Sequence, residues 1–142
     1  MRDRALFDTN ILVYSIDNSH PIKKRIASDL IREYGKCDRL VLSTQVISEF
    51  YVVLTKKLKI KPLDAKAIVQ PLSGFETITI SQKAINEAID ISILNKLSFW
   101  DSLVIASAQC YNISTLFTED LNSGQIVRGV KIINPFLGSY HL

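Results

Sequence analysis

Short apolar runs alternate with longer amphipathic segments along the chain, and this alternation predicts a mixed α/β protein. The short runs have the length and the β-branched composition of buried strands. They cover residues 5–7 (ALF), 40–43 (LVLS), 76–80 (ETITI), 114–118 (STLFT) and 130–134 (VKIIN). The Asp, Thr and Asn at positions 8–10 follow the first run and are expected to form a turn there.

The segments between these runs carry helix signals. Apolar residues recur at helical spacing, and helices are predicted over residues 21–34, 45–58, 63–72, 82–96 and 98–111. Pro21 lies in the expected first turn, Gly35 follows the expected last turn, and Pro62 is expected to end the next helical unit. The expected N-terminal caps are Ser43 or Thr44, Ser81 and Ser98.

Strands that alternate with helices need crossover connections, which produce a largely parallel sheet with helices on both faces. A chain of 142 residues is long enough for one domain with its own core, so we expect a single domain over residues 1–142. In sheets of this class, sites form in the crevice beyond the carboxyl ends of the strands. Functional residues are therefore expected at those ends.

The composition favours a soluble protein of the cytoplasm. Apolar residues make up 47% and charged residues 22%, as in a folded globular protein. Cys37 and Cys110 show no C-x-x-C spacing and are expected to be reduced. No segment approaches the ~18 continuous apolar residues of a membrane helix, and the first ten residues lack the pattern of a signal peptide. We therefore expect no membrane partner.

The net charge of +3 is mildly basic and compatible with a polyanionic partner. Four lysines are clustered in one segment, namely Lys56, Lys57, Lys59 and Lys61. A solvated helix end, where lysines complement the helix dipole, explains the cluster without any ligand. Contact with the phosphates of a nucleic acid is the functional interpretation.

Four acidic residues occupy unusual positions. Asp8 and Asp120 each follow a predicted strand directly. Glu49 lies in a predicted helix with valines three residues before and four residues after it, and Asp101 is aligned with the apolar stripe of the helix over 98–111. Glu119, beside Asp120, is an alternative to it. These positions place acids at strand ends and on the buried faces of helices.

Each of these acids also has an ordinary structural interpretation. Asp is favoured in turns and at helix caps, a helix-edge Glu can extend into water, and Ser98-x-x-Asp101 approximates a capping box. If the four converge at one crevice, however, they repel one another unless a cation holds them. Carboxylate oxygens suit Mg²⁺ or Mn²⁺, and such a site activates water and stabilises charge that develops on phosphorus.

Other catalytic signatures are missing from the sequence. It contains no G-x-S-x-G, no G-x-x-x-x-G-K-[ST] and no G-x-G-x-x-G. Its two histidines, His20 and His141, do not support a zinc site or a histidine-based triad. An acid-only metal site is the chemistry that remains.

Four segments together resemble the PIN-domain family, and most closely its VapC-like toxin branch. They are FDTNILVYSID at 7–17, SEF at 48–50, SFWDSLVIASA at 98–108 and TEDLNSGQ at 118–125. Their order and spacing span nearly the whole chain. The resemblance implies a three-layer fold in which helices flank a short parallel sheet. It also implies a Mg²⁺- or Mn²⁺-dependent endoribonuclease, the toxin of a toxin–antitoxin pair.

The resemblance also implies roles for individual residues. The positions that match the family's metal-binding acids are Asp8, Glu49, Asp101 and Asp120, and those that match the adjacent small polar residues are Asn10 and Thr118. The implied partners are an RNA substrate, a cognate antitoxin whose tail enters the acidic site, and a second copy of the chain. This chain has Ser123 where family members often have His, so the resemblance assigns no substrate contact to that position.

Two other functions remain open from the sequence. If the protein is an aspartate-dependent phosphatase or phosphotransferase, Asp8 is its nucleophile. Such enzymes commonly have a second acid two residues after the nucleophile, but this chain has Asn10 there. A non-catalytic RNA-binding or interaction module with this fold is the other alternative. A complete set of four acids favours catalysis over a degenerate site.

Overall fold

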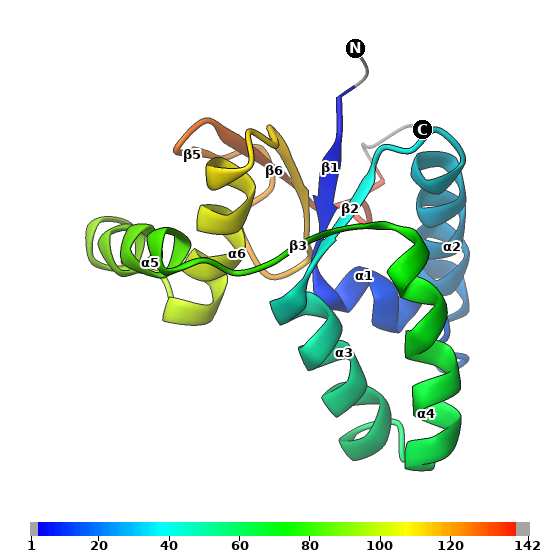
Figure 1. Cartoon of the computed structure of the whole chain (residues 1–142). Coiled ribbons are helices and arrows are strands. Elements are labelled where there is room, and N and C mark those ends of the chain that lie inside the picture. The colour runs from blue at the N-terminus through cyan, green and yellow to red at the C-terminus, as the bar shows by residue number, and fades with distance from the viewer. Residues whose placement is uncertain (1–2, 139–142) are drawn as a thin grey trace.

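The computed structural model describes residues 3–138, and helices flank both faces of its central sheet (Figure 1). His141 lies outside the described residues. The strands are β1 (Ala5–Phe7), β2 (Leu40–Ser43), β3 (Glu76–Ile78), β4 (Thr115–Phe117), β5 (Ile126–Val127) and β6 (Val130–Ile133). The helices are α1 (Thr9–Tyr14), α2 (Pro21–Lys36), α3 (Thr44–Lys56), α4 (Pro62–Val69), α5 (Gln82–Asn95) and α6 (Phe99–Cys110), with a 3₁₀ turn over Gln70–Gly74.

The strands form one sheet in the order β3-β2-β1-β4-β6-β5. Every pairing is parallel except that of β5 with β6. The chain moves outward from β1 to β2 and β3, then returns through α5 and α6 to place β4 on the other side of β1. This arrangement confirms the predicted three-layer α/β fold with a mainly parallel sheet.

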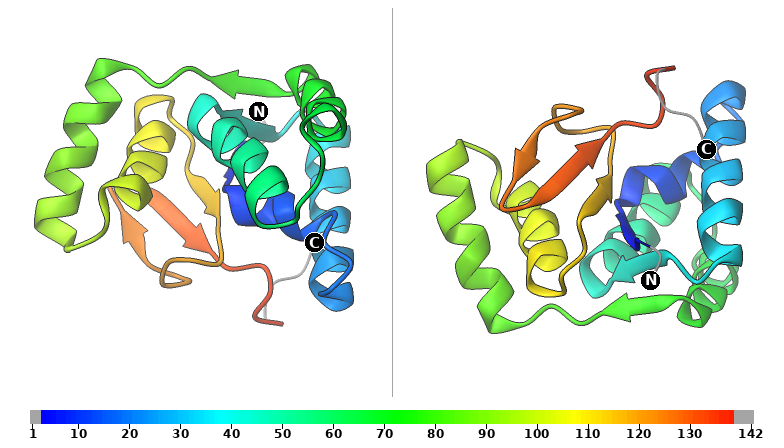
Figure 2. Two further views of the ribbon diagram at one scale, coloured as in Figure 1. Left: turned by 90° about the horizontal axis from the view of Figure 1, so that it is seen from below. Right: turned by 90° about the horizontal axis from the view of Figure 1, so that it is seen from above.

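Alternation along the strands divides the core between the two faces. Leu6 and Leu116 point to the face covered by α5 and α6, whereas their neighbours Phe7 and Phe117 pack with α1, α2 and α3 on the other face. All four side chains are fully buried. Figure 2 shows the two groups of helices on opposite sides of the sheet. Because both faces are covered there, the central strands β1, β2 and β4 are nearly continuous apolar runs rather than alternating ones.

The helix starts follow the predicted capping chemistry. Three serine hydroxyls accept a hydrogen bond from the backbone N–H three residues later, each at 3.1 Å, and they belong to Ser43, Ser81 and Ser98. Serine at this position satisfies an N–H group that has no partner within the helix. Ser43, rather than Thr44, therefore caps α3.

Several predicted boundaries were wrong. The Asp–Thr–Asn segment is not a turn: Asp8 caps α1, which begins at Thr9 and had not been predicted. Gly35 lies inside α2, where a Cβ would come within 3.1 Å of the Phe75 ring, so close packing rather than helix termination explains the glycine. Pro62 begins α4, because proline at the first helical position needs no N–H partner.

Strand β5 was also missed. It pairs with β6 through a two-residue hairpin in which Arg128 and Gly129 have φ of +52° and +79°. A type I′ turn, one of the two types favoured in such loops, has positive φ at both central residues, and glycine supplies one of them without strain. A strand of two residues is too short to give a periodic signal.

Cys37 and Cys110 are both free thiols. Among residues 3–138, no helix is long and apolar enough to cross a membrane.

Candidate active site

The pairing of β1 with β4 creates the crevice on which the candidate site is built. From these neighbouring strands the chain proceeds toward opposite edges of the sheet, to β2 after β1 and to β5 and β6 after β4, so their carboxyl ends form a topological switch point. The backbone N–H of Asp8 donates to the carbonyl of Phe117 at 3.0 Å, which extends the pairing beyond both strands. Asp8 and Thr118 therefore lie side by side.

The Asp8 carboxylate is buried and held from two sides. It is 6% exposed. Its Oδ1 accepts from the backbone N–H of Thr9 at 2.8 Å, and its Oδ2 accepts from the hydroxyl of Thr118 at 2.8 Å. Burial raises the pKa of this carboxyl to about 6, against the lowering effect of these two hydrogen bonds. The site thus contains a buried acid that is costly to ionise.

Asn10 and Thr118 connect Asp8 to the loop that carries Asp120. The Asn10 amide donates to the Thr118 hydroxyl at 3.2 Å and to Asp120 Oδ2 at 3.1 Å, while its carbonyl accepts from the backbone N–H of Glu119 at 3.2 Å. The Thr118 hydroxyl accepts from the backbone N–H of Asp120 at 3.1 Å. These two small polar residues therefore orient two carboxylates.

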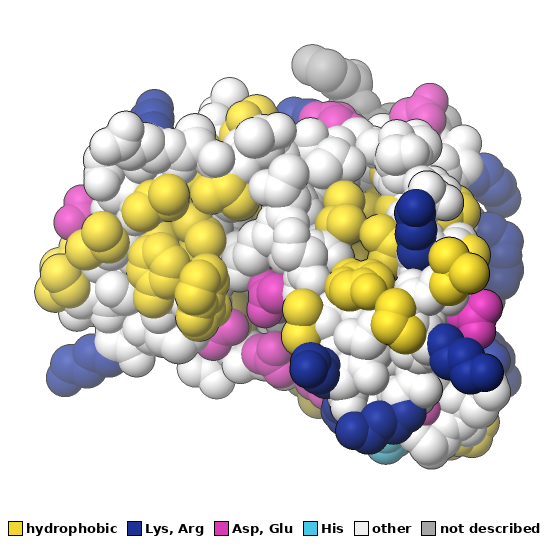
Figure 3. Space-filling model, turned by 60° about the horizontal axis from the view of Figure 1, so that its bottom comes forward, with side chains coloured by type: hydrophobic (Ala, Val, Ile, Leu, Met, Phe, Trp, Pro, Cys, Tyr) yellow, Lys and Arg dark blue, Asp and Glu magenta, His cyan; other side chains and the backbone are white. Residues whose placement is uncertain are grey.

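Glu49 and Asp101 approach the crevice from helices α3 and α6. Glu49 lies on an exposed part of α3, so it borders the apolar face rather than joining it. Asp101 is half-buried in the first turn of α6, and the residues three, four and seven positions later are all buried. The capping hydroxyl of Ser98 holds the turn that presents Asp101. Figure 3 shows acidic side chains gathered in the middle of this face, between an apolar area and basic side chains.

Asp120 is close enough to the other three acids to affect their ionisation. The charge of Asp120 raises the pKa of each of the other three. Burial is the largest cause of the raised pKa at Asp8, Glu49 and Asp101, and hydrogen bonds oppose it. Four segments that are far apart in sequence thus supply carboxylates to one electrostatically coupled cluster.

The Glu119 carboxylate has partners of its own outside this cluster. Its carboxylate accepts a hydrogen bond from the Tyr14 hydroxyl at 2.6 Å and forms an ion pair with Lys23. These contacts lower the pKa of Glu119 despite its partial burial. Asp120, not Glu119, therefore joins the acidic cluster, while Glu119 ties the loop to α1 and α2. The sequence offered no signal for the Tyr14 and Lys23 contacts, because both partners lie about a hundred positions away.

One of the four lysines in the predicted cluster lies beside the acidic site, and the other three do not line its cavity. Lys57 lines a cavity of about 280 Å³ together with Asn10, Glu49 and Asp120. The other three are exposed around the α3–α4 connection, and they are Lys56, Lys59 and Lys61. Only Lys57 thus borders the acidic site directly.

Ser123 has a structural contact. Its hydroxyl accepts a hydrogen bond from the backbone N–H of Asn134 at 2.9 Å. The side chain therefore fixes the loop after Asp120 to the end of β6.

The donor set of the cluster fits a hard divalent cation. Its ligands would be carboxylate oxygens, which Mg²⁺ and Mn²⁺ prefer. Among residues 3–138, no three acidic, histidine or cysteine side chains are grouped closely enough to hold a metal as they stand. Glu49 is exposed, so rotation of its side chain can bring its oxygens toward the other carboxylates.

The same geometry disfavours Asp8 as a covalent nucleophile. Both of its oxygens accept hydrogen bonds, from Thr9 and from Thr118, and little of the side chain is accessible. A nucleophile must reach the reacting atom directly. Asp8 is therefore poorly placed to attack phosphorus.

The raised pKa of Asp8 predicts that its charge destabilises the metal-free protein. The folded-state pKa of about 6 exceeds 3.8, so the cost of ionisation is complete above pH 6 and diminishes as the pH falls toward 3.8. In EDTA at pH 7.5, Asp8→Asn should raise the free energy of unfolding by about 1–3 kcal/mol, and this gain should shrink at pH 4.5. Urea denaturation measures both values. A variant less stable than the wild type at pH 7.5 would contradict this account of the site.

Comparisons with known proteins agree with this fold. The family model of the PIN domain matches residues 5–126. No curated protein matched the sequence. A toxin–antitoxin complex from Klebsiella pneumoniae has a chain that is 24% identical with a TM-score of 0.68, over 93% of this chain and 98% of that one.

Two further solved structures have the same fold. VapBC2 from Rickettsia felis, bound to a fragment of its promoter DNA, is 21% identical with a TM-score of 0.69, over 90% of this chain and 96% of that one. VapC20 from Mycobacterium tuberculosis is described as a toxin that cleaves the sarcin–ricin loop. It is 17% identical with a TM-score of 0.64, over 87% of this chain and 97% of that one. With the family model spanning most of its length, the chain belongs to the PIN-domain family.

Proposed function

We propose that this protein is a Mg²⁺- or Mn²⁺-dependent endoribonuclease and the toxin of a toxin–antitoxin pair in the cytoplasm. The observation that carries the proposal is the convergence of four carboxylates at the switch point of a PIN-domain sheet. The VapC20 neighbour is described as an RNA-cleaving toxin, and this supports the choice of RNA as the substrate. The reaction is hydrolysis of a phosphodiester bond by water.

Asp8, Glu49, Asp101 and Asp120 are the residues proposed to hold the cation. When bound there, the cation supplies an activated water and neutralises charge that develops on the phosphate oxygens. Asn10 and Thr118 keep the carboxylates of Asp120 and Asp8 in fixed orientations through the hydrogen bonds described above. Orientation before the reaction lowers the cost of reorganisation in the transition state.

Two protein partners belong to the proposal. The Klebsiella pneumoniae and Rickettsia felis neighbours are toxin–antitoxin complexes, which supports a cognate antitoxin for this chain. A homodimer is supported by apolar side chains that α5 leaves exposed, namely Ile85, Ile89, Ile93 and Leu94. Contiguous exposed apolar surface on a helix is typical of an interaction site.

Cleavage of RNA by the purified protein tests the proposed activity. Structured RNA should be cut in Mg²⁺ or Mn²⁺ and not in EDTA. Asp101→Asn and Asp8→Asn should each lower the cleavage rate by more than about 100-fold, because loss of groups that merely orient metal ligands already costs 10- to 100-fold.

Asp64→Asn is the matched control. Asp64 is an exposed acid in the first turn of α4, and its replacement should leave the rate unchanged. Full activity of Asp101→Asn, or cleavage in EDTA equal to that in Mg²⁺, would exclude a metal-dependent mechanism at this site.

The position of Lys57 predicts a specific effect on RNA binding. A lysine beside the acidic cluster offsets repulsion of the phosphate backbone, so Lys57→Ala should weaken RNA binding and reduce the slope of log K against log salt by about 0.7–1. Fluorescence anisotropy at several salt concentrations measures both. Lys83→Ala, at an exposed lysine on α5, is the control. An unchanged affinity and slope for Lys57→Ala would show that this lysine is only part of the surface.

A further inference from the structure

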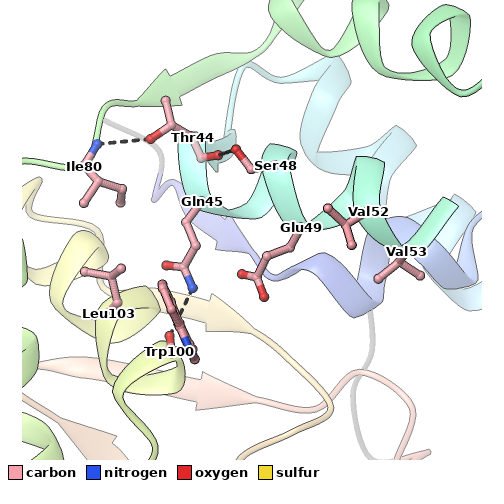
Figure 4. Close-up of a pocket in the computed structure, with 9 residues that line it drawn as sticks. All are labelled: Thr44, Gln45, Ser48, Glu49, Val52, Val53, Ile80, Trp100 and Leu103. Carbon is pink, nitrogen blue, oxygen red and sulfur yellow. Dashed lines mark hydrogen bonds between the residues drawn. The ribbon is translucent and has the colours of Figure 1, made fainter. Parts of the chain in front are cut away.

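A second hollow lies beside the acidic cluster, between α3 and the start of α6. It has a volume of about 550 Å³. Figure 4 shows the side chains that line it, which are Thr44, Gln45, Ser48, Glu49, Val52, Val53, Ile80, Trp100 and Leu103. We call this hollow the Trp100 groove. Its walls are mainly apolar, with Glu49 at the border that it shares with the acidic cluster.

Gln45 presents an unpaired acceptor in this groove. The side chain is only 9% exposed, and its Nε2 donates to the backbone carbonyl of Trp100 at 3.1 Å. That bond fixes the orientation of the amide, since only the nitrogen can donate to a carbonyl. Oε1 is buried and accepts no hydrogen bond from any residue in the part of the chain that the structure describes. A buried acceptor of this kind calls for a donor from a ligand.

The neighbouring hydroxyls already have partners. Thr44 Oγ1 accepts from the backbone N–H of Ile80 at 3.2 Å, and Ser48 donates to the backbone carbonyl of Thr44 at 2.6 Å. Neither hydroxyl is bonded to Gln45. Among Thr44, Gln45 and Ser48, Gln45 is therefore the residue with a buried acceptor that lacks a donor, and the Glu49 carboxylate also lines the groove.

Trp100 gives the groove an exposed aromatic wall. Its side chain is 62% exposed, although it precedes the half-buried Asp101 in the first turn of α6. The Phe99 ring packs against the core and contacts the indole edge-on, with centroids 5.1 Å apart. The Phe99 ring thus packs against the Trp100 indole and limits its movement. An aromatic side chain beside apolar walls and one hydrogen-bonding amide suits a flat, polar-edged ring.

We infer that the Trp100 groove binds a nucleobase of the RNA, next to the phosphodiester that the acidic cluster cleaves. The base stacks on Trp100, and one of its N–H groups donates to Gln45 Oε1. This inference rests on the proposed function, because it assigns the groove to the same substrate. An apolar side chain from a peptide is less suited to the groove, since it would leave the buried Gln45 Oε1 without a donor.

Trp100 provides a direct probe, because it is the single tryptophan of the chain. Nucleoside 5′-monophosphates should change its fluorescence, excited at 295 nm, in a saturable manner. Ribose 5-phosphate, which has the sugar and phosphate but no base, should not. Gln45→Leu should weaken the nucleotide response by about three- to tenfold, whereas Gln82→Leu, at an exposed glutamine on α5, should leave it unchanged.

Kinetics on a short RNA provide the second arm. Trp100→Ala should raise KM by about 5- to 100-fold, the range expected for loss of one base-stacking contact, with kcat changed less than KM. Trp100→Phe should recover most of the loss because it keeps an aromatic face. Trp100 is mostly exposed, so its replacement leaves the core intact.

The outcomes separate this inference from the proposed function. A nucleotide response that depends on Gln45, without any RNA cleavage, supports the base site and removes the nuclease proposal. Cleavage with an unchanged KM in Trp100→Ala and Gln45→Leu, and no response to nucleotides, overturns the base site and leaves the nuclease. In that case the groove is available for an apolar segment of a protein partner.

Discussion

The parallel pairing of β1 with β4 is the constraint on which the rest of this structure depends. It places Asp8 beside Thr118 and joins them by a 2.8 Å hydrogen bond, at the point where the chain leaves the two strands in opposite directions. Residues 110 positions apart in sequence thereby meet at one crevice. Burial of Asp8 at this junction disfavours its charged form, and the pKa of the carboxyl is raised accordingly. A cation bound beside Asp8 would stabilise the charged carboxylate, and its binding would in turn stabilise the folded protein.

Around this junction, hydrogen bonds orient the carboxylates, and apolar packing positions the helices. Asn10, Thr118 and the backbone of the following loop hold the carboxylates of Asp8 and Asp120, while Tyr14 and Lys23 hold Glu119 away from them. The two apolar cores lie on opposite faces of the sheet and fix the helices that carry Glu49 and Asp101. Core packing thus holds the helices that carry Glu49 and Asp101.

The sequence predicted the layers of this fold because strand and helix periods are local properties. The apolar strands and the serine caps at Ser43, Ser81 and Ser98 were all identifiable from neighbouring residues. Helix α1 and strand β5 were missed because each is short and stabilised by tertiary contacts. The four acids were selected for their places at strand ends and on helix faces, and the family resemblance then joined them into one site.

Other features depend on contacts that no local pattern encodes. The choice between Asp120 and Glu119 is made by Tyr14 and Lys23, which are distant in sequence. The unpaired oxygen of Gln45 results from the position of the Trp100 carbonyl, 55 residues away. Propensity and spacing carry no information about such pairs. The acidic cluster was therefore accessible from the sequence, whereas the groove beside it was not.

The central claim is that carboxylates from four separate segments form one cation site. Titration of Mn²⁺ into the protein, followed by the loss of the free-ion electron paramagnetic resonance signal, tests it most directly because no substrate is needed. The account predicts saturable binding by the wild type, binding at least about tenfold weaker for Asp8→Asn and for Asp101→Asn, and wild-type binding for Asp64→Asn. Equal Mn²⁺ affinity in all four proteins, or no binding by the wild type, would contradict it.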